Sequence, residues 1–84
     1  MARPPLIFTK HAQDMLSERR LRRDWVETTI AEPEAIESDP NRPQLTRAYR
    51  RIPERGGLWL RVVYEVTDRG INVITAFFDR RGRS

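Results

Sequence analysis

The sequence predicts a small α+β domain in which two N-terminal helices pack on one face of a three- to four-stranded antiparallel sheet. Apolar residues recur at helical spacing early in the chain and at alternate positions later. Clusters of proline and glycine separate these segments and indicate turns. With 84 residues, the chain is expected to form a single domain over residues 1–84.

The first helix is expected over residues 10–19, with Thr9 as its N-cap. The positions on its inner side follow i, i+3, i+4, i+7 spacing and are Ala12, Met15, Leu16 and Arg19.

A second helix follows an arginine-rich connection. Asp24 and Glu27 have the spacing of a capping box at its start. Its apolar stripe consists of Trp25, Val26, Thr29 and Ile30. Pro33 disfavours a helical conformation at the preceding residue, so the helix is expected to end near Glu32.

Strands are expected after the helices, at residues 35–37, 45–52, 58–66 and 71–78. If Asp68 and Arg69 are the turn residues of the last hairpin, its cross-strand pairs are Val66 with Ile71, Tyr64 with Val73 and Val62 with Thr75. Alternation then predicts an apolar face that carries the helices, formed by Leu58, Leu60, Val62, Tyr64, Val66, Ile71, Val73, Thr75 and Phe77.

The opposite face is expected to hold Trp59, Arg61, Val63, Glu65, Ile74, Ala76 and Phe78. If the preceding hairpin keeps its phase, Arg47, Tyr49 and Arg51 join this face, whereas a one-residue slip brings Arg50 there instead. Arginines interleaved with aromatic rings suit single-stranded RNA, because guanidinium groups neutralise phosphates and rings stack on bases. A solvated sheet face whose arginine stems cover apolar neighbours explains the same pattern.

Charge is distributed unevenly along the chain, whose net charge is +4. Residues 1–43 carry seven basic and eight acidic side chains, whereas residues 44–84 carry nine and four. The basic second half contains the predicted sheet, which is consistent with a surface that binds polyanions.

Candidate chemistry is limited by composition, since the chain has no cysteine and only one histidine. No metal-ligand set, phosphate-binding glycine loop or cofactor site is expected, so a hydrolase here is expected to work by proton transfer and charge stabilisation. His11 lies in the first helical turn, where the helix dipole disfavours imidazolium, so it is a candidate general base or an ordinary surface histidine. Thr75 either positions a substrate or is a structural strand residue, and Asp79 and Glu65 are candidate acids without a supporting spacing.

The composition and length of the chain also predict its cellular compartment and its oligomeric state. A small domain without cysteine is typical of the cytoplasm. No apolar run reaches the ~20 residues that span a membrane, and the first residues lack a signal-peptide core. Because so short a chain has a thin core, we expect a monomer or a weak homodimer.

Several segments together resemble the DUF4258 family of small bacterial proteins. They are residues 8–12 (Phe-Thr-Lys-His-Ala), Arg19, Leu21, Val26, Pro33, residues 47–49, residues 60–64 and residues 73–76. This family looks like a distant relative of RelE-like toxins, in which two helices pack on an antiparallel sheet whose other face cuts RNA without metal. The resemblance implies that His11, Arg47, Arg61 and Thr75 are the catalytic candidates, with an antitoxin as partner.

The chain departs from the family pattern at two positions. Met15 stands where the family often has arginine, and Arg22 stands where it often has serine or threonine. In addition, the predicted register places Arg61 and Thr75 on opposite faces, so they share a site only across a bulge or at an edge. The expected function is a metal-free, toxin-type endoribonuclease that acts on RNA, with nucleic-acid binding through Arg51, Tyr49, Trp59 and, after a slip, Arg50. The alternatives are a non-catalytic nucleic-acid-binding module and a protein-interaction domain.

Overall fold

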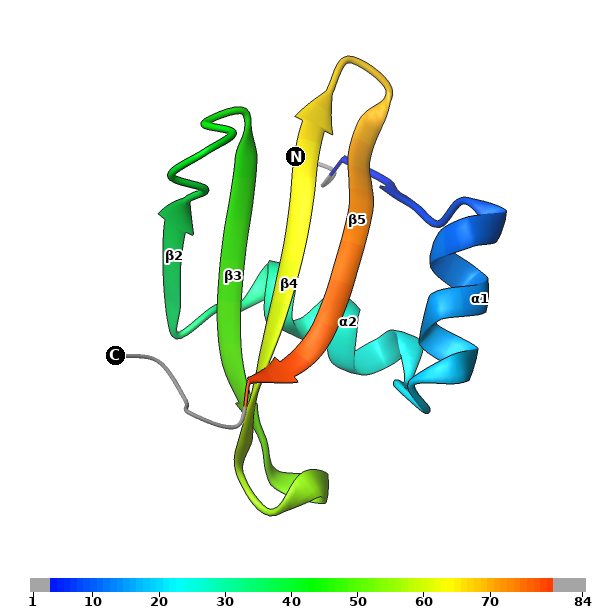
Figure 1. Cartoon of the computed structure of the whole chain (residues 1–84), viewed down its shortest axis with the longest axis vertical. Helices are drawn as coiled ribbons and strands as arrows, with labels where there is room; N and C mark the ends of the chain where they lie inside the picture. The colour runs from blue at the N-terminus through cyan, green and yellow to red at the C-terminus, as the bar shows by residue number, and fades with distance from the viewer. Residues whose placement is uncertain (1–3, 80–84) are drawn as a thin grey trace.

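A five-stranded sheet with two helices forms the protein in a computed structural model that describes residues 4–79 (Figure 1). The elements are β1 (Leu6–Ile7), α1 (Lys10–Glu18), α2 (Arg23–Ala31), β2 (Ala35–Ser38), β3 (Leu45–Ile52), a 3₁₀ turn (Pro53–Arg55), β4 (Leu58–Thr67) and β5 (Gly70–Asp79). The order across the sheet is β1-β5-β4-β3-β2. The predicted α+β class, with helices on one sheet face, is confirmed.

The sheet has more strands than predicted. The two-residue strand β1 adds to β5 in parallel, whereas every other pair is antiparallel, so the sheet is mixed. Gly70, at φ 141°, allows this approach, because a Cβ there would collide with the carbonyl oxygen of Pro5. The same oxygen accepts the Ile71 N–H at 2.8 Å, which fixes β1 against β5.

Helix α1 forms as predicted. The Thr9 hydroxyl accepts the Ala12 N–H at 3.1 Å and caps the first turn. The helix buries Ala12, Met15 and Leu16 and ends with Arg19 as its C-cap.

The predicted capping box of α2 is wrong. Because the helix already begins at Arg23, Asp24 lies within its first turn and accepts Arg22 Nε at 2.9 Å. Glu27 pairs with Arg23 at 3.4 Å instead of reaching back to the cap. The helix ends at Ala31, close to the predicted position.

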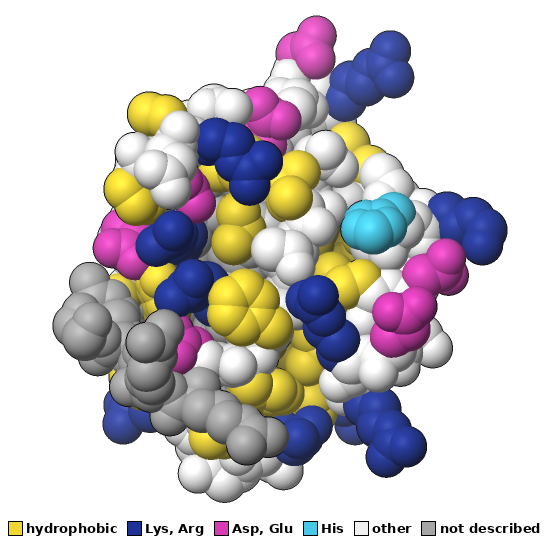
Figure 2. Space-filling view, viewed as in Figure 1, with side chains coloured by type: hydrophobic (Ala, Val, Ile, Leu, Met, Phe, Trp, Pro, Cys, Tyr) yellow, Lys and Arg dark blue, Asp and Glu magenta, His cyan; other side chains and the backbone are white. Residues whose placement is uncertain are grey.

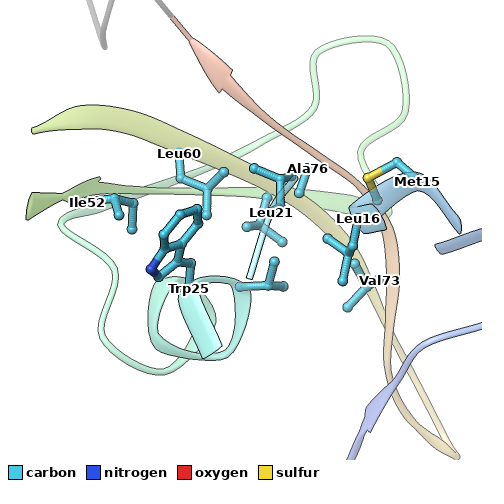
Figure 3. Close-up of a cluster of buried hydrophobic side chains, with 10 residues drawn as sticks. Met15, Leu16, Leu21, Trp25, Ile52, Leu60, Val73 and Ala76 are labelled. Carbon is cyan, nitrogen blue, oxygen red and sulfur yellow. The ribbon is translucent and has the colours of Figure 1, made fainter. Parts of the chain in front are cut away.

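One apolar core lies between the helices and the sheet (Figure 3). It contains Met15, Leu16, Leu21, Trp25, Val26, Ile52, Leu60, Val62, Val73 and Ala76. Trp25 also meets Phe78 edge to face, with ring centroids 5.9 Å apart. All core members are hydrophobic, so burial of apolar surface is the main force that holds the helices on this face.

A β-bulge in β5 corrects the predicted register. Val66 opposes Ile71 and Tyr64 opposes Val73, as predicted. Beyond them Ile74 is inserted, so that Val62 opposes Ala76 and not Thr75. An extra residue reverses the alternation of every side chain that follows it.

The faces of the second half of β5 are therefore the reverse of those predicted. Ala76 and Phe78 point toward the helices, whereas Thr75 and Phe77 lie on the sheet face without helices, here called the open face. Three cross-strand rows form the centre of the open face: Arg47–Val63–Thr75, Tyr49–Arg61–Phe77 and Arg51–Trp59–Asp79. The predicted phase of β3 and β4 is confirmed, and the slip alternative is wrong, because Arg50 opposes Leu60 on the helix side.

Candidate functional site

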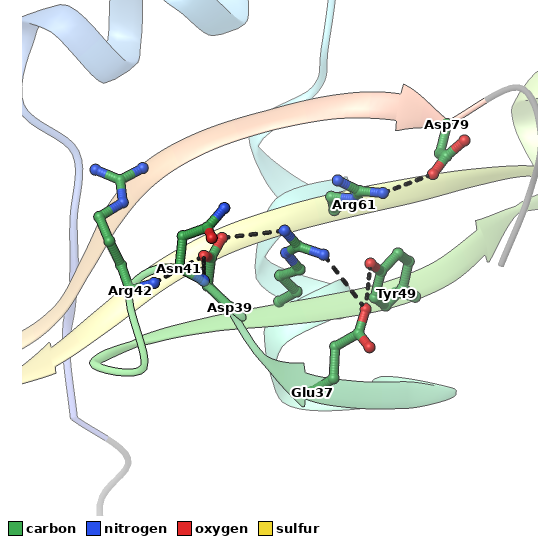
Figure 4. Close-up of polar contacts among 8 residues, drawn as sticks. Glu37, Asp39, Asn41, Arg42, Tyr49, Arg61 and Asp79 are labelled. Carbon is green, nitrogen blue, oxygen red and sulfur yellow. Dashed lines mark hydrogen bonds and ion pairs between the residues drawn. The ribbon is translucent and has the colours of Figure 1, made fainter. Parts of the chain in front are cut away.

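Arg47 on the open face is held between two carboxylates of the β2 region (Figure 4). Its guanidinium contacts Asp39 at 3.1 Å and Glu37 at 3.7 Å, and its side chain is 22% exposed. The Asp39 carboxylate also accepts the backbone N–H groups of Asn41 and Arg42 at 2.9 and 3.0 Å. These backbone bonds, with a further contribution from Arg47, lower the pKa of Asp39.

Arg61 is similarly engaged at the centre of the open face. It donates to Asp79 at 2.8 Å, and the two side chains are 21% and 9% exposed. Its guanidinium also stacks over the rings of Tyr49 and Phe77, at 5.3 and 5.0 Å from their centroids. These contacts are those of a packed polar layer, in which an arginine is fixed by its neighbours.

Arg51 completes this layer. It forms an ion pair with Glu34 at 2.8 Å and lies 5.3 Å from the centroid of the Trp59 ring. The Arg51 contacts, the side-chain hydrogen bond above all, lower the pKa of Glu34. In Figure 2, acidic side chains lie among the arginines over the β2 and β3 side of this face.

Tyr49 lies too deep to stack on a base. It is 2% exposed and donates its hydroxyl to Glu37 at 2.7 Å. Burial raises its pKa, with the bond to Glu37 adding to the effect. Of the predicted nucleic-acid-binding residues, Arg51, Tyr49 and Trp59 therefore share the open face, while Arg50 lies on the other side and donates to the Glu32 carbonyl at 2.6 Å.

A different site lies at the edge of the sheet, in a cleft of about 450 Å³ that we call the α1–β5 cleft. It is lined by His11, Asp14, Met15, Glu18, Arg19, Arg42, Ile74 and Thr75. Helix α1 supplies one wall and the bulged part of β5 the other. The histidine side chain is visible beside the sheet in the space-filling view (Figure 2).

Arg19 joins the two walls of the α1–β5 cleft. Its Nη1 donates to the Thr75 hydroxyl at 3.0 Å and to the Ala76 carbonyl at 2.8 Å. Both acceptors lie on β5 beyond the two residues that pair with β1, where the end of α1 reaches the edge of the sheet.

Arg42 reaches the α1–β5 cleft from the loop between β2 and β3. Its side chain points away from the Asp39–Arg47 pair (Figure 4). Within residues 4–79, neither Arg42 nor Arg19 has a carboxylate within 4.0 Å of its guanidinium. The two cations of the α1–β5 cleft therefore differ from the arginines of the open face.

The same cleft contains negative charge on its helical wall. Asp14 pairs with Lys10 at 3.4 Å, with both side chains largely exposed, and Glu18 follows one turn later. His11 is exposed in the first turn, and its imidazole forms no hydrogen bond or ion pair with any described residue. An accessible imidazole and two arginines can bind an anion and transfer a proton, whereas the two carboxylates oppose anion binding on the helical wall.

The four predicted catalytic residues divide between two places. His11 and Thr75 line the α1–β5 cleft, whereas Arg47 and Arg61 belong to the open face and have carboxylate partners. The prediction that Arg61 and Thr75 occupy opposite faces is wrong, since the bulge places both on the open-face side.

Four polar cleft residues were missed as site candidates, namely Asp14, Glu18, Arg19 and Arg42. Arg19 had a signal in the sequence, because an arginine on the inner stripe of an amphipathic helix needs a polar partner beyond that helix. Arg42 lies in an irregular loop, and no pattern in the sequence indicated that it would belong to a site.

The fold and the cleft define a small α+β protein with a polar site between its first helix and the bulged strand of a mixed sheet. The chain belongs to the family described as "Domain of unknown function (DUF4258)", whose model matches residues 8–78, as predicted. No curated protein and no solved structure matches the chain. In the described residues, no helix is long and apolar enough to cross a bilayer, and no three His, Cys, Asp or Glu side chains gather as a metal site.

Proposed function

We propose that this protein is a metal-independent endoribonuclease of the toxin type, with the α1–β5 cleft as its active site. One observation carries the proposal. The cleft combines the chain's single histidine with two arginines whose guanidinium groups form no ion pair with a described carboxylate. The proposal also gives the cytoplasm as the compartment, which agrees with the lack of cysteine.

RNA is the proposed substrate because it carries its own nucleophile. The 2′-hydroxyl loses its proton to His11, and its oxygen forms a bond to the adjacent phosphorus. The bond from phosphorus to the 5′-oxygen breaks, and that oxygen takes a proton from the imidazolium. The products are a 2′,3′-cyclic phosphate and a 5′-hydroxyl, without any oxidant or second reactant.

Arg19 and Arg42 stabilise the negative charge that develops on the phosphoryl oxygens. Both side chains line the α1–β5 cleft, and neither guanidinium is paired with a described carboxylate. Preorganised cations at such a position lower the barrier more than they strengthen ground-state binding. In this proposal Thr75 acts as a positioning residue, because its hydroxyl holds the Arg19 guanidinium at 3.0 Å.

The open face contributes a place for a base beside the cleft. Phe77 follows Thr75 by two residues on the same face, about 7 Å along the strand. It is half-buried, and the Arg61 guanidinium holds its ring. Arg47 and Arg61 then stabilise the surface on which the RNA lies, instead of contacting the reacting phosphate.

The test is cleavage of a fluorescent single-stranded RNA by purified protein in EDTA. We expect His11→Ala to reduce the rate at least ~100-fold, as for loss of a general base. Arg42→Ala is expected to lower the cleavage rate and also to weaken RNA binding, whereas Arg69→Ala, which removes the same charge from the turn after β4, changes neither. A substrate with one 2′-deoxy position before the cleaved phosphate should resist cleavage there.

A second outcome distinguishes the non-catalytic alternative. If RNA binds with a steep salt dependence that Arg42→Ala reduces, yet stays intact, the protein is a binding module that uses the same cleft. Equal cleavage by wild type and His11→Ala would contradict the proposed active site. Growth arrest on expression, relieved by His11→Ala and by a co-expressed protein inhibitor, would support the toxin assignment and the predicted antitoxin.

A further inference from the structure

The two edges of the sheet differ in how they are protected. At the β5 edge, β1, the bulge and the Arg19 bond to the Ala76 carbonyl occupy the outer side of the strand. At the other edge, β2 pairs only with β3, and no described segment lies along its outer side. Unpaired backbone groups along an edge strand are a template for another strand.

An apolar row of side chains leads to the β2 edge. On the helix side of the sheet, Ala76, Val62 and Ala48 lie side by side and are all 0% exposed. The next member of the row is Ile36 on β2, which is 57% exposed. It is one of two large hydrophobic side chains that are exposed among the described residues. The buried row therefore ends in a largely exposed apolar side chain that the described residues leave uncovered.

We propose that two copies of this chain associate through their β2 strands, in antiparallel fashion, around a two-fold axis at Ile36. A two-fold interface uses the same patch on both copies. Residues directly opposite each other in an antiparallel pair have their side chains on the same face of the sheet. In a symmetric pair of β2 strands, one residue must therefore lie opposite its own copy, and the two-fold axis passes between those two copies. Within the four-residue strand, only axes at Ile36 and Glu37 give more than one cross-strand pair, and an axis at Ala35 gives one.

Side-chain chemistry selects the register at Ile36. That register places Ile36 against the partner's Ile36 and Glu37 against the partner's Ala35. Centring on Glu37 sets two carboxylates against each other, and centring on Ala35 sets Ile36 against the partner's Glu34. Only the register at Ile36 joins the two apolar rows without opposing like charges.

The flanking sequence keeps the contact short. Pro33 and Pro40 lie on either side of β2 and have no backbone N–H to donate. The pairing is therefore confined to the strand, and the dimer is expected to be reversible and dependent on concentration. Because β2 is at the opposite edge of the sheet from β5, both α1–β5 clefts stay open in the dimer.

The chain has no cysteine, so a single introduced cysteine gives a direct test. In the proposed register, Ile36→Cys brings two sulfurs into disulfide range, since opposed Cα atoms in antiparallel strands are ~4.5–5.5 Å apart. Glu37→Cys is the matched control. In the proposed register the cysteine at position 37 faces the partner's Ala35, so the two introduced cysteines are offset by two residues along the strands. Under mild oxidation, we expect Ile36→Cys to form covalent dimer at least ~10-fold faster than Glu37→Cys.

Sedimentation of the wild-type chain provides the second measurement. The average mass should rise with concentration, and Ile36→Lys should abolish the rise while keeping the wild-type circular dichroism spectrum. A wild-type chain that stays monomeric up to about millimolar concentration overturns the proposal. Faster crosslinking of Glu37→Cys overturns the register.

Discussion

The open face and the α1–β5 cleft both carry arginines, but they use them differently. On the open face, Arg47, Arg51 and Arg61 each meet a carboxylate within about 3 Å. In the α1–β5 cleft, Arg19 donates to neutral oxygens, and the Arg42 guanidinium contacts no described carboxylate. The comparison teaches that the number of arginines on a surface does not identify a binding site, because their partners decide whether charge is available.

The largest expected effect is that of deleting Ile74. This deletion removes the β5 bulge, which lies between the open face and the α1–β5 cleft. A regular ladder would turn Ala76 and Phe78 out of the core and take both β5 acceptors away from Arg19. We expect a loss of about 4 kcal/mol or more in the free energy of unfolding, measured with urea. Ile74→Ala keeps the bulge and is expected to cost about 1 kcal/mol, so equal losses would contradict this role.

Replacing one arginine in each region sharpens the comparison. Arg61→Ala removes a largely buried ion pair and two ring contacts, so we expect about 2 kcal/mol less stability. Arg42→Ala is expected to change stability by less than about 0.5 kcal/mol, because the side chain is exposed and unpaired. RNA binding should show the reverse order, so that Arg42→Ala weakens it more than Arg61→Ala does. A stability loss of the same size in both variants would show that the regions do not differ.

The smallest expected effect is on the pH dependence of stability. The folded protein lowers the pKa of Asp39 below its ordinary 3.8, through backbone bonds from Asn41 and Arg42 and then the Arg47 contact. A carboxyl with a lowered pKa contributes stability that is present above pH ~3.8 and is lost as the pH falls through its folded value. Urea unfolding between pH 7 and pH 3 should therefore show a shallower acid loss in Asp39→Asn. The same slope in both proteins would contradict this contribution.

Much of the fold was predictable because local patterns determine it. The spacing of Ala12, Met15 and Leu16 identified α1, and the alternation along β3 and β4 identified their two faces. The bulge was not predictable, because Ile74 lies in a run of strand-forming residues without a glycine or proline to mark it.

The site was harder to predict than the fold. His11 and Thr75 were identified from the type of residue and its position, and they line the same cleft. The carboxylates that neutralise the open-face arginines lie up to 18 residues away along the chain, as Asp79 does from Arg61. Such pairs depend on how strands and loops meet, and no pattern along a single element contains that information.

The contact of Pro5 with Gly70 has a consequence for folding during synthesis. Strand β1 is synthesised before the other described elements, yet it has no partner until β5, near the other end of the described chain, has been made. The hairpin of β4 and β5 can form from neighbouring residues, whereas the β1 pairing must wait for almost the whole chain. Closure of this edge is therefore a late event, and it reports that both ends of the domain have emerged.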